Sequence, residues 1–288
     1  MSRTKGPDRR INPYREDLAA AYLRGEVKAE RFVEGEDRQV KVACAPLLVR
    51  PDADAPMDTQ LLFGETFRVY EEKGGFAWGQ SAHDDYVGYV EAKALGPKPY
   101  KPTHVVAALR TFIYPEADLK TRPAMPLGLN AKVRVIGARG DYSEIERGGW
   151  IFTQHLAPVG AYVRDFVSVA EEHLGVPYLW GGRESTGLDC SGLVQASLER
   201  AGISSLRDTD LQEATLGERL PEPIDFTTLR RGDLVFWKGH VAIMVDGERI
   251  IHANAFHMRV EIERLDIAMA RIARTAGHVT TVKRLARR

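Results

Sequence analysis

The sequence predicts a multidomain chain in which two small all-β barrels are followed by an α+β domain. Three observations point to this fold class. Short alternating strands and turns fill the region from about residue 39 to about residue 158, and a pattern of about sixty residues occurs twice within it. From about residue 161 onward, helical segments come first and alternating strands follow, which is typical of α+β domains. With 288 residues, 44% of them hydrophobic and 28% charged, the chain can bury a core in each part.

The N-terminal segment, residues 1–37, is expected to be partly loose and partly helical. Residues 1–12 are basic and polar. The stretch that follows, NPYREDLAAAYLRGEVKAERF, has helical composition, and Leu18, Tyr22 and Leu23 form a short apolar stripe suited to contact with a neighbouring element. The sequence leaves open whether this segment packs against the rest of the chain.

Residues 38–98 and 103–159 are predicted to be two copies of one β module. LLVRPDADAP resembles TFIYPEADLK, FGETFRV resembles LGLNAKVRV, and YVGYVEAKALGP resembles RGGWIFTQHLAP. The strand order, the glycine after the first loop and the closing strand resemble bacterial SH3-like barrels, which usually bind peptides or cell-wall fragments. The first copy has a longer hairpin, SAHDDYVGYV. The aligned positions are Pro51 with Pro115, Gly64 with Gly128, Gly88 with Gly149, Leu95 with Leu156, and Pro97 with Pro158.

The C-terminal domain, residues 160–288, contains the predicted helices and a later set of strands. YVRDFVSVAEEHLGVP predicts a helix that ends at Gly175 and Pro177, and SGLVQASLERAG predicts a second helix that ends at Gly202. DLVFWKGHVAIMVDGERIIHANAF predicts strands joined by a tight turn at Asp246 and Gly247.

Cys190 stands at the start of the second predicted helix and is a candidate nucleophile. The other cysteine, Cys44, is most simply a buried strand residue, and two distant cysteines make no disulfide framework. A lone cysteine is most simply a small buried hydrophobe. A helix N-terminus, however, favours a thiolate and lowers the pKa of a thiol. Gly181, Gly182 and Gly187 also allow the backbone to approach a ligand closely.

A cysteine nucleophile needs a base, and His240 and His252 are the candidates. Their relation depends on the register of the predicted hairpin. A three-residue loop at 246–248 places Ala242 opposite His252 and makes His240 a diagonal neighbour on the same face, about 7–8 Å away. A two-residue loop places the two histidines on opposite faces. The spacing alone leaves both arrangements open.

Two segments, YLWGGRESTGLDCSGLVQ and RRGDLVFWKGHVAIMVDGERIIHA, resemble the NlpC family of papain-like cysteine peptidases over most of residues 161–257. The order DCSG, GDLVFW, GHVAI and IHA carries the resemblance. It implies that Cys190 is the nucleophile, that His240 is the general base and that His252 orients the base. It also implies that Tyr178 lies near the oxyanion site. No metal ion or other cofactor is expected.

The domain plan is similar to that of γ-D-glutamyl-L-diamino acid endopeptidases of the dipeptidyl-peptidase VI type. This resemblance implies hydrolysis of the γ-D-Glu–diamino acid bond in free muropeptides that bear an N-terminal L-Ala, as in cell-wall peptide recycling. It implies that residues beside the nucleophile hold the free amine and that a tyrosine of the first SH3-like module closes the pocket. The residues assigned to substrate binding are Asp189, Ser191, Tyr86, Trp180, Asp208 and Thr209.

Charge and composition limit the partners further. Lysines plus arginines and aspartates plus glutamates number 40 each, so no nucleic acid and no membrane is expected as a partner. The resemblance implies a small cell-wall-derived peptide as the partner. The N-terminus lacks the apolar core of a signal peptide, so the expected location is the cytoplasm. Three alternatives stay open: an exported hydrolase of intact peptidoglycan, a non-catalytic module that binds wall peptides, and an acyltransferase. His173 is expected to face solvent, and His257 and His278 to lack partners at metal-ligand spacing.

Overall fold

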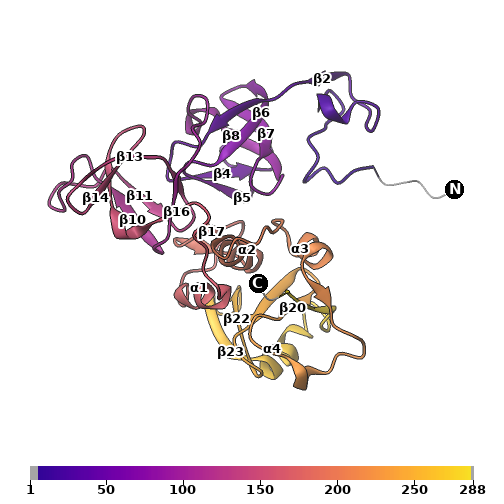
Figure 1. Cartoon of the computed structure of the whole chain (residues 1–288). Helices are drawn as coiled ribbons and strands as arrows, with labels where there is room; N and C mark the ends of the chain where they lie inside the picture. The colour runs from indigo at the N-terminus through magenta and orange to yellow at the C-terminus, as the bar shows by residue number, and fades with distance from the viewer. Residues whose placement is uncertain (1–5, 287–288) are drawn as a thin grey trace. The chain divides into compact units, whose positions relative to one another are not determined.

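The computed structural model of the chain describes residues 6–286 (Figure 1). Among these residues, contacts define two compact units. The first contains the residues up to Val105, together with Phe112–Leu127 and Ala131–Gln154. The second contains Val106–Thr111, Gly128–Asn130 and the residues from His155 onward.

The N-terminal segment forms short strands, so the predicted helix is wrong. β1 (Leu18–Ala20) pairs in parallel with β2 (Arg31–Val33), and a single 3-10 turn, Ala21–Leu23, follows β1. Pairing with β2, which begins eleven residues after β1 ends, satisfies hydrogen-bonding groups of the extended backbone. Helical composition is a weak preference that such tertiary contacts override.

This segment packs against the first β module. Leu18 and Leu23 are fully buried in a cluster with Tyr70 and Trp78 of that module. The guanidinium of Arg15 lies 4.4 Å from the ring centroid of Trp78. Residues of the N-terminal segment thus extend the core of the module that follows them.

The first β module is a six-stranded antiparallel sheet in the order β3-β6-β7-β8-β4-β5. Its buried core includes Leu47, Leu61, Phe67 and Val90, and Tyr86 belongs to the same core. The strands are β3 (Glu36–Gln39), β4 (Cys44–Leu48), β5 (Met57–Leu62), β6 (Thr66–Lys73), β7 (Phe76–Ser81) and β8 (Val87–Glu91).

Residues 103–159 form eight short strands in three small sheets. Both β modules end alike, because β8 leads directly into a 3-10 turn at Ala92–Ala94 and β15 into one at Thr153–His155. This likeness supports the repeat, and a second complete barrel remains a prediction. The strands are β9 (His104–Val106), β10 (Arg110–Ile113), β11 (Met125–Gly128), β12 (Lys132–Val133), β13 (Val135–Arg139), β14 (Tyr142–Ile145), β15 (Trp150–Phe152) and β16 (Leu156–Pro158).

The second unit contains the predicted α+β domain. Its first helices are α1 (Phe166–Glu172), α2 (Cys190–Arg200) and α3 (Thr209–Thr215), with the short hairpin β17 (Arg183–Glu184) and β18 (Gly187–Leu188) before α2. An antiparallel sheet follows in the order β19-β24-β20-β21-β22-β23. Its strands are β19 (Glu218–Arg219), β20 (Leu234–Trp237), β21 (His240–Met244), β22 (Arg249–Asn254), β23 (Arg259–Arg264) and β24 (Thr281–Arg284), and α4 (Leu265–Ile272) follows β23.

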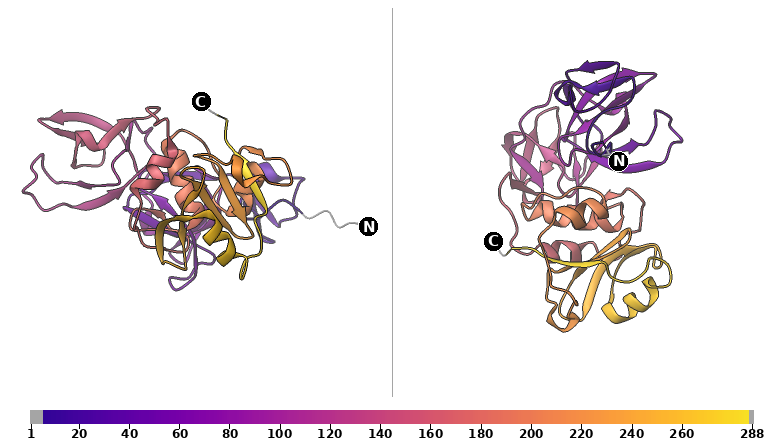
Figure 2. Two further views of the ribbon diagram at one scale, coloured as in Figure 1. Left: turned by 90° about the horizontal axis from the view of Figure 1, so that it is seen from below. Right: turned by 90° about the vertical axis from the view of Figure 1, so that its right-hand side faces the viewer.

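Both faces of this sheet are covered by helices (Figure 2). Val241 and Ile251 point to one face and pack in the core that contains residues of α1 and α2. Ala242 and Ile250 point to the other face and pack with Leu265 of α4. Because side chains alternate along a strand, His240 and His252 lie on the face that α4 covers.

Two short segments of the second β module belong to the same unit as the α+β domain. Asn130 donates a hydrogen bond from its side-chain amide to the carbonyl of Ala196 in α2, at 2.9 Å. Arg110 donates to the carbonyl of Ser185 at 2.6 Å and to its hydroxyl at 3.2 Å. These contacts hold the helix that starts at Cys190 and the hairpin that precedes it.

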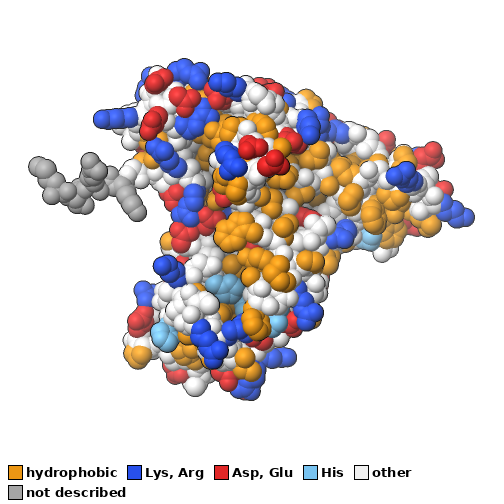
Figure 3. Space-filling view, turned by 180° about the vertical axis from the view of Figure 1, so that it is seen from behind, with side chains coloured by type: hydrophobic (Ala, Val, Ile, Leu, Met, Phe, Trp, Pro, Cys, Tyr) orange, Lys and Arg blue, Asp and Glu red, His pale blue; other side chains and the backbone are white. Residues whose placement is uncertain are grey.

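On the face drawn in Figure 3, lysines and arginines are mixed with acidic side chains, in keeping with the formal net charge of zero. Within the part of the chain that the structure describes, no helix is long and apolar enough to span a membrane.

Candidate active site

Cys190 is the first residue of α2, as the sequence predicted. Asp189 caps the helix, and its carboxylate accepts hydrogen bonds from the backbone N–H groups of Gly192 at 2.7 Å and Gly181 at 2.8 Å. Aspartate is among the preferred residues at this position because its oxygens satisfy N–H groups that the first helical turn leaves without partners. The cap therefore determines where the helix begins and where the thiol lies.

The glycines before Cys190 allow close packing of the loop itself. A Cβ atom on Gly182 would lie 2.3 Å from the carbonyl oxygen of Gly187, and one on Gly187 would lie 2.5 Å from the Cβ of Leu179. Their neighbours are protein atoms, so the expectation that these glycines make room for a ligand is wrong for Gly182 and Gly187.

Arg207 is a buried partner that the sequence analysis missed. Its side chain is 1% exposed, and its two terminal nitrogens donate to the two carboxylate oxygens of Asp189 at 2.9 and 2.6 Å. It also donates to the hydroxyl of Ser191 at 2.7 Å and to the carbonyl of Gly182 at 3.2 Å. The expected roles of Asp189 and Ser191 in binding a substrate amine stay predictions, and both side chains already contact Arg207.

The thiol of Cys190 is nearly enclosed, with the residue 8% exposed. Burial and the nearby charge of Asp189 raise the pKa of the thiol, whereas the N–H of Val241 and the hydroxyl of Thr209 oppose that rise. The sulfur lies 3.7 Å from the Thr209 hydroxyl. The helix N-terminus was expected to lower this pKa, but desolvation of the thiolate has the larger effect. The resting thiol is therefore protonated at neutral pH and needs a base.

The register of the hairpin brings the two histidines together. Ile243 lies opposite Ile251, which is the register of the three-residue loop and places Ala242 opposite His252. Nε2 of His240 lies 2.8 Å from Nδ1 of His252. Burial and the charges of His252 and Arg271 lower the pKa of His240 to about 3. His240 is thus neutral at rest and can accept a proton. Val241 follows His240 in β21, and its backbone N–H faces the thiol, so this strand reaches the nucleophile.

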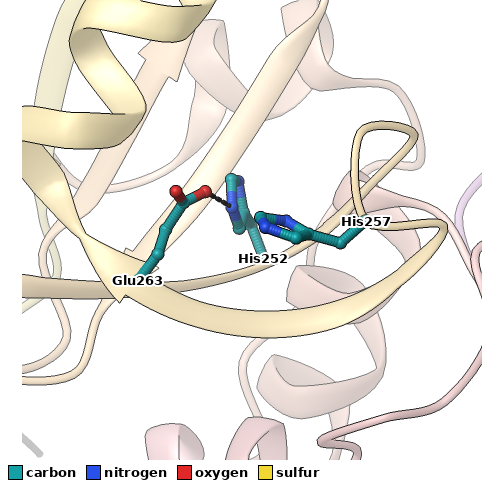
Figure 4. A group of neighbouring side chains, drawn as sticks. All are labelled: His252, His257 and Glu263. Carbon is teal, nitrogen blue, oxygen red and sulfur yellow. Dashed lines mark hydrogen bonds and ion pairs between the residues drawn. The ribbon is translucent and has the colours of Figure 1, made fainter.

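The hydrogen-bonded chain continues beyond His252 to residues that the sequence analysis did not select (Figure 4). Nε2 of His252 lies 2.7 Å from a carboxylate oxygen of Glu263 in β23. Arg271 of α4 donates to both oxygens of Glu263, at 2.5 and 2.6 Å. Burial disfavours the charged carboxylate, but the hydrogen bonds from Arg271 and His252 outweigh it and lower the pKa of Glu263 to about 2.

Tyr178 lies near the thiol, as expected. Burial and the charges of Cys190 and Asp189 raise the pKa of its hydroxyl to about 12. The hydroxyl stays protonated at neutral pH and can donate a hydrogen bond to a developing negative charge. A bridge between Tyr178 and Leu188 and a hydrogen bond from the Tyr178 N–H to the Met258 carbonyl at 2.9 Å hold this residue in place.

This geometry agrees with what the chain resembles. Residues 175–276 match the model of the NlpC/P60 family, and residues 47–95 match that of the bacterial dipeptidyl-peptidase SH3 domain. The chain thus contains a bacterial dipeptidyl-peptidase SH3 domain followed by an NlpC/P60 peptidase domain. The NlpC/P60 domain thus includes Cys190, both histidines and Glu263, and the matched SH3 domain covers most of the first β module.

Two curated relatives cover most of the chain. A protein of Lysinibacillus sphaericus named dipeptidyl-peptidase 6 is 24% identical, over 77% of this chain and 89% of the relative. A protein of Bacillus subtilis named γ-D-glutamyl-L-lysine dipeptidyl-peptidase is 27% identical, over 73% of this chain and 76% of the relative. A solved NlpC/P60 family protein from Bacillus cereus has a TM-score of 0.72 at 19% identity, covering 86% of this chain and 99% of its own, which shows a shared fold.

The other residues predicted to bind substrate lie in different parts of the structure. Thr209, the first residue of α3, contacts the sulfur of Cys190, and Asp208 precedes it as the cap residue of α3. Trp180 is in the loop before the nucleophile and is 68% exposed. Tyr86 belongs to the other compact unit, where it is buried in the core of the SH3 domain. The substrate roles of Trp180 and Tyr86 stay predictions.

Three other expectations need correction. His173 is fully buried at the end of α1 and does not face solvent, and its Nδ1 lies 2.8 Å from the carbonyl of Val169. Cys44 is in a strand, as expected, but is only partly buried. His257 has neighbours at metal-ligand spacing, because one ligand atom each from His252, His257 and Glu263 lie within 4.8 Å of one another (Figure 4).

Proposed function

We propose that this NlpC/P60 peptidase hydrolyses the γ-D-Glu–diamino acid bond of free muropeptides that bear an N-terminal L-Ala. The observation that carries the proposal is the surroundings of Cys190, whose thiol lies near Tyr178, the Thr209 hydroxyl and the backbone N–H of Val241. Val241 directly follows His240, which is hydrogen-bonded to His252, and the chain is similar to named γ-D-glutamyl-L-lysine dipeptidyl-peptidases. As part of the same proposal, the enzyme acts in the cytoplasm on wall peptides that are being recycled.

The first step forms an acyl-enzyme. His240 accepts the proton of the Cys190 thiol as the sulfur attacks the γ-carbonyl carbon, and a carbon–sulfur bond forms. The Tyr178 hydroxyl and the backbone N–H of Cys190 donate to the resulting oxyanion, and donors of this kind contribute about 2.7–4 kcal/mol each to the transition state. His240 then gives its proton to the amine of the diamino acid as the carbon–nitrogen bond breaks.

The second step regenerates the thiol. Water loses a proton to His240 and attacks the thioester carbon. The carbon–sulfur bond breaks, and the proton on His240 returns to the sulfur. His252 keeps the His240 ring oriented through both steps, the role of a third member in a catalytic triad.

The free N-terminus of the substrate needs a charged partner near the nucleophile. A buried ammonium without such a partner is energetically expensive. Asp189 directly precedes Cys190, and Asp208 directly precedes Thr209, which contacts the sulfur. We therefore assign the amine of L-Ala to these two carboxylates beside the nucleophile, and the neutral amide of an N-acetylated peptide should be rejected.

The test compares three substrates with one enzyme preparation. L-Ala-γ-D-Glu-diaminopimelate, the same peptide N-acetylated, and intact sacculi are incubated with the protein and with Cys190→Ala, and products are identified by mass spectrometry. Release of L-Ala-D-Glu from the free peptide alone, abolished in Cys190→Ala, is the expected result. Cleavage of sacculi in preference to the free peptide overturns the proposal in favour of a wall hydrolase, and cleavage of none favours a binding module.

A further inference from the structure

We propose that Glu263, held by Arg271, is a positioning residue of the peptidase, which sets the tautomer and orientation of His252 and through it those of His240. The inference rests on the peptidase chemistry and not on the identity of the peptide. It assigns to β23 and α4 a part in catalysis, although neither element carries the nucleophile or the base.

The contacts form one chain across three strands and one helix. Nε2 of His240 in β21 is 2.8 Å from Nδ1 of His252 in β22, and Nε2 of His252 is 2.7 Å from an oxygen of Glu263 in β23. Arg271 of α4 closes the chain with two hydrogen bonds to that carboxylate. The His252 side chain is 0% exposed and that of Glu263 is 11% exposed, so water has little access to compete for these hydrogen bonds.

The carboxylate determines which nitrogens carry protons. An ionised Glu263 can only accept, so Nε2 of His252 must carry the proton that it receives. Nδ1 of His252 is then the bare nitrogen and accepts from Nε2–H of His240. The bare Nδ1 of His240 is left to take the thiol proton. Without an acceptor at Glu263 the pair has a second tautomeric arrangement, in which Nδ1 of His240 already carries a proton and cannot act as the base.

Arg271 keeps the carboxylate from becoming a competing base. Glu263 alone would favour protonated histidines and hold the proton that His240 needs to transfer. The guanidinium balances this charge, and it is itself held 4.4 Å from the ring centroid of Phe256. Two further titratable groups lie near His252: His257, from the turn between β22 and β23, and Glu261, which lies opposite His252 in the strand register. Among the residues that the structure describes, the charged and titratable groups around Glu263 thus include His240, His252, His257, Glu261 and Arg271.

A purely structural role for Glu263 is the competing explanation, because the same ion pair links β23 to α4. Such a role lowers stability but leaves the proton affinity of the site unchanged. Glu261 provides a matched control. It lies two residues earlier in β23, directly opposite His252 in the strand register, but its carboxylate accepts from Arg259.

The experiment measures Glu263→Gln and Glu261→Gln beside the parent enzyme. Glutamine retains the shape of the side chain but has an amide that can donate as well as accept. We expect kcat to fall roughly ten- to a hundredfold in Glu263→Gln, the range found when a metal-ligating histidine loses its carboxylate partner, with little change in KM. The pH profile of Cys190 alkylation by iodoacetamide should shift in the same variant, and ¹⁵N shifts of the histidines should show mixed tautomers. Glu261→Gln should match the parent in all three.

Alkylation and NMR need no substrate, so failure of this inference is distinguishable from failure of the proposed peptide specificity. A folded Glu263→Gln whose kcat, alkylation profile and ¹⁵N shifts all equal those of the parent overturns the inference. If Glu263→Gln does not fold, Arg271→Lys, which retains the charge but not the two-pronged contact, carries the same test: unchanged tautomers and alkylation overturn the proposal.

Discussion

One buried and one partly buried acid–arginine pair flank the predicted catalytic residues and serve different purposes. Asp189 and Arg207 lie beside the nucleophile, and Glu263 and Arg271 lie behind the histidines. The two carboxylates differ in the group, other than arginine, from which each accepts a hydrogen bond. Asp189 receives backbone N–H groups and so holds the loop and helix that position the thiol. Glu263 receives a histidine ring and so acts on the proton chemistry of the base. The same kind of ion pair thus supports local structure at Asp189 and proton transfer at Glu263.

The largest effect on stability is expected when the pair of Asp189 and Arg207 is broken. Arg207→Met leaves Asp189 buried without its counter-charge, and we expect the free energy of unfolding to fall by about 3–5 kcal/mol. Urea denaturation followed by circular dichroism measures it. Arg231→Met serves as the control, since Arg231 pairs with Asp165 and Glu171 at the exposed surface and should cost less than about 1 kcal/mol. Equal losses in both variants would contradict the structural role of Arg207.

His173 is buried without a counter-charge among the described residues, so the pH dependence of its contribution to stability is a reference for both acid–arginine pairs. Burial lowers the pKa of His173, so below about pH 6.5 the unfolded chain binds a proton there that the folded chain does not. Its contribution to stability is complete above that pH and falls as the pH drops, by about 1.4 kcal/mol per pH unit. His173→Leu should therefore lose less stability than the parent between pH 7 and pH 5, in urea titrations at each pH. The exposed His278→Leu should behave like the parent.

The catalytic pair is expected to shift activity with pH more than it shifts stability. The charge of Arg271 contributes to the lowered pKa of His240 and of His252. Arg271→Met should raise both values, and a protonated base cannot accept the thiol proton. The acid side of the kcat/KM profile, which the pKa of His240 places near pH 3 in the parent, should move to higher pH, with about a tenfold loss of activity at the most acidic pH for each unit by which the pKa rises and little change at pH 8. Arg259→Met, in the same strand as Glu263, should leave the profile unchanged, and an equal shift in both variants would refute this assignment.

The smallest expected effect concerns metal binding. In the parent, Arg271 occupies the carboxylate of Glu263, which competes with any cation at the group of His252, His257 and Glu263. Removing that guanidinium in Arg271→Met should increase zinc affinity. Competition with a chromophoric chelator measures it in the Cys190→Ala background, where the thiol cannot bind zinc. His257→Ala should reverse the gain, and equal zinc affinity with and without Arg271 would show that the arginine does not protect the site.

Local patterns in the sequence were enough to predict most helices and strands of the α+β domain. The helix start at Cys190, the glycine-ended helices and the strands on either side of the 246–248 loop are all present. The prediction of an N-terminal helix failed because β1 pairs with β2 instead, and because Leu18 and Leu23 are buried against Trp78. The two possible hairpin registers could not be separated from the sequence, because both strands contain consecutive apolar residues that face both sides of the sheet, and the hydrophobic pattern therefore favours neither register.

The sequence by itself placed Cys190 at a helix start and His240 and His252 in strands, and its resemblance to a peptidase family predicted that these residues and Tyr178 carry the chemistry. The positions in helix and strand follow from local order, since a capping residue, a turn and a strand period each act over a few positions. Only the tertiary structure decided which charges reach them. Arg207 meets Asp189 across a loop, and Arg271 meets Glu263 from a following helix. Partners of this kind depend on how elements pack, and desolvation in that packing, more than the helix terminus, sets the pKa of the thiol.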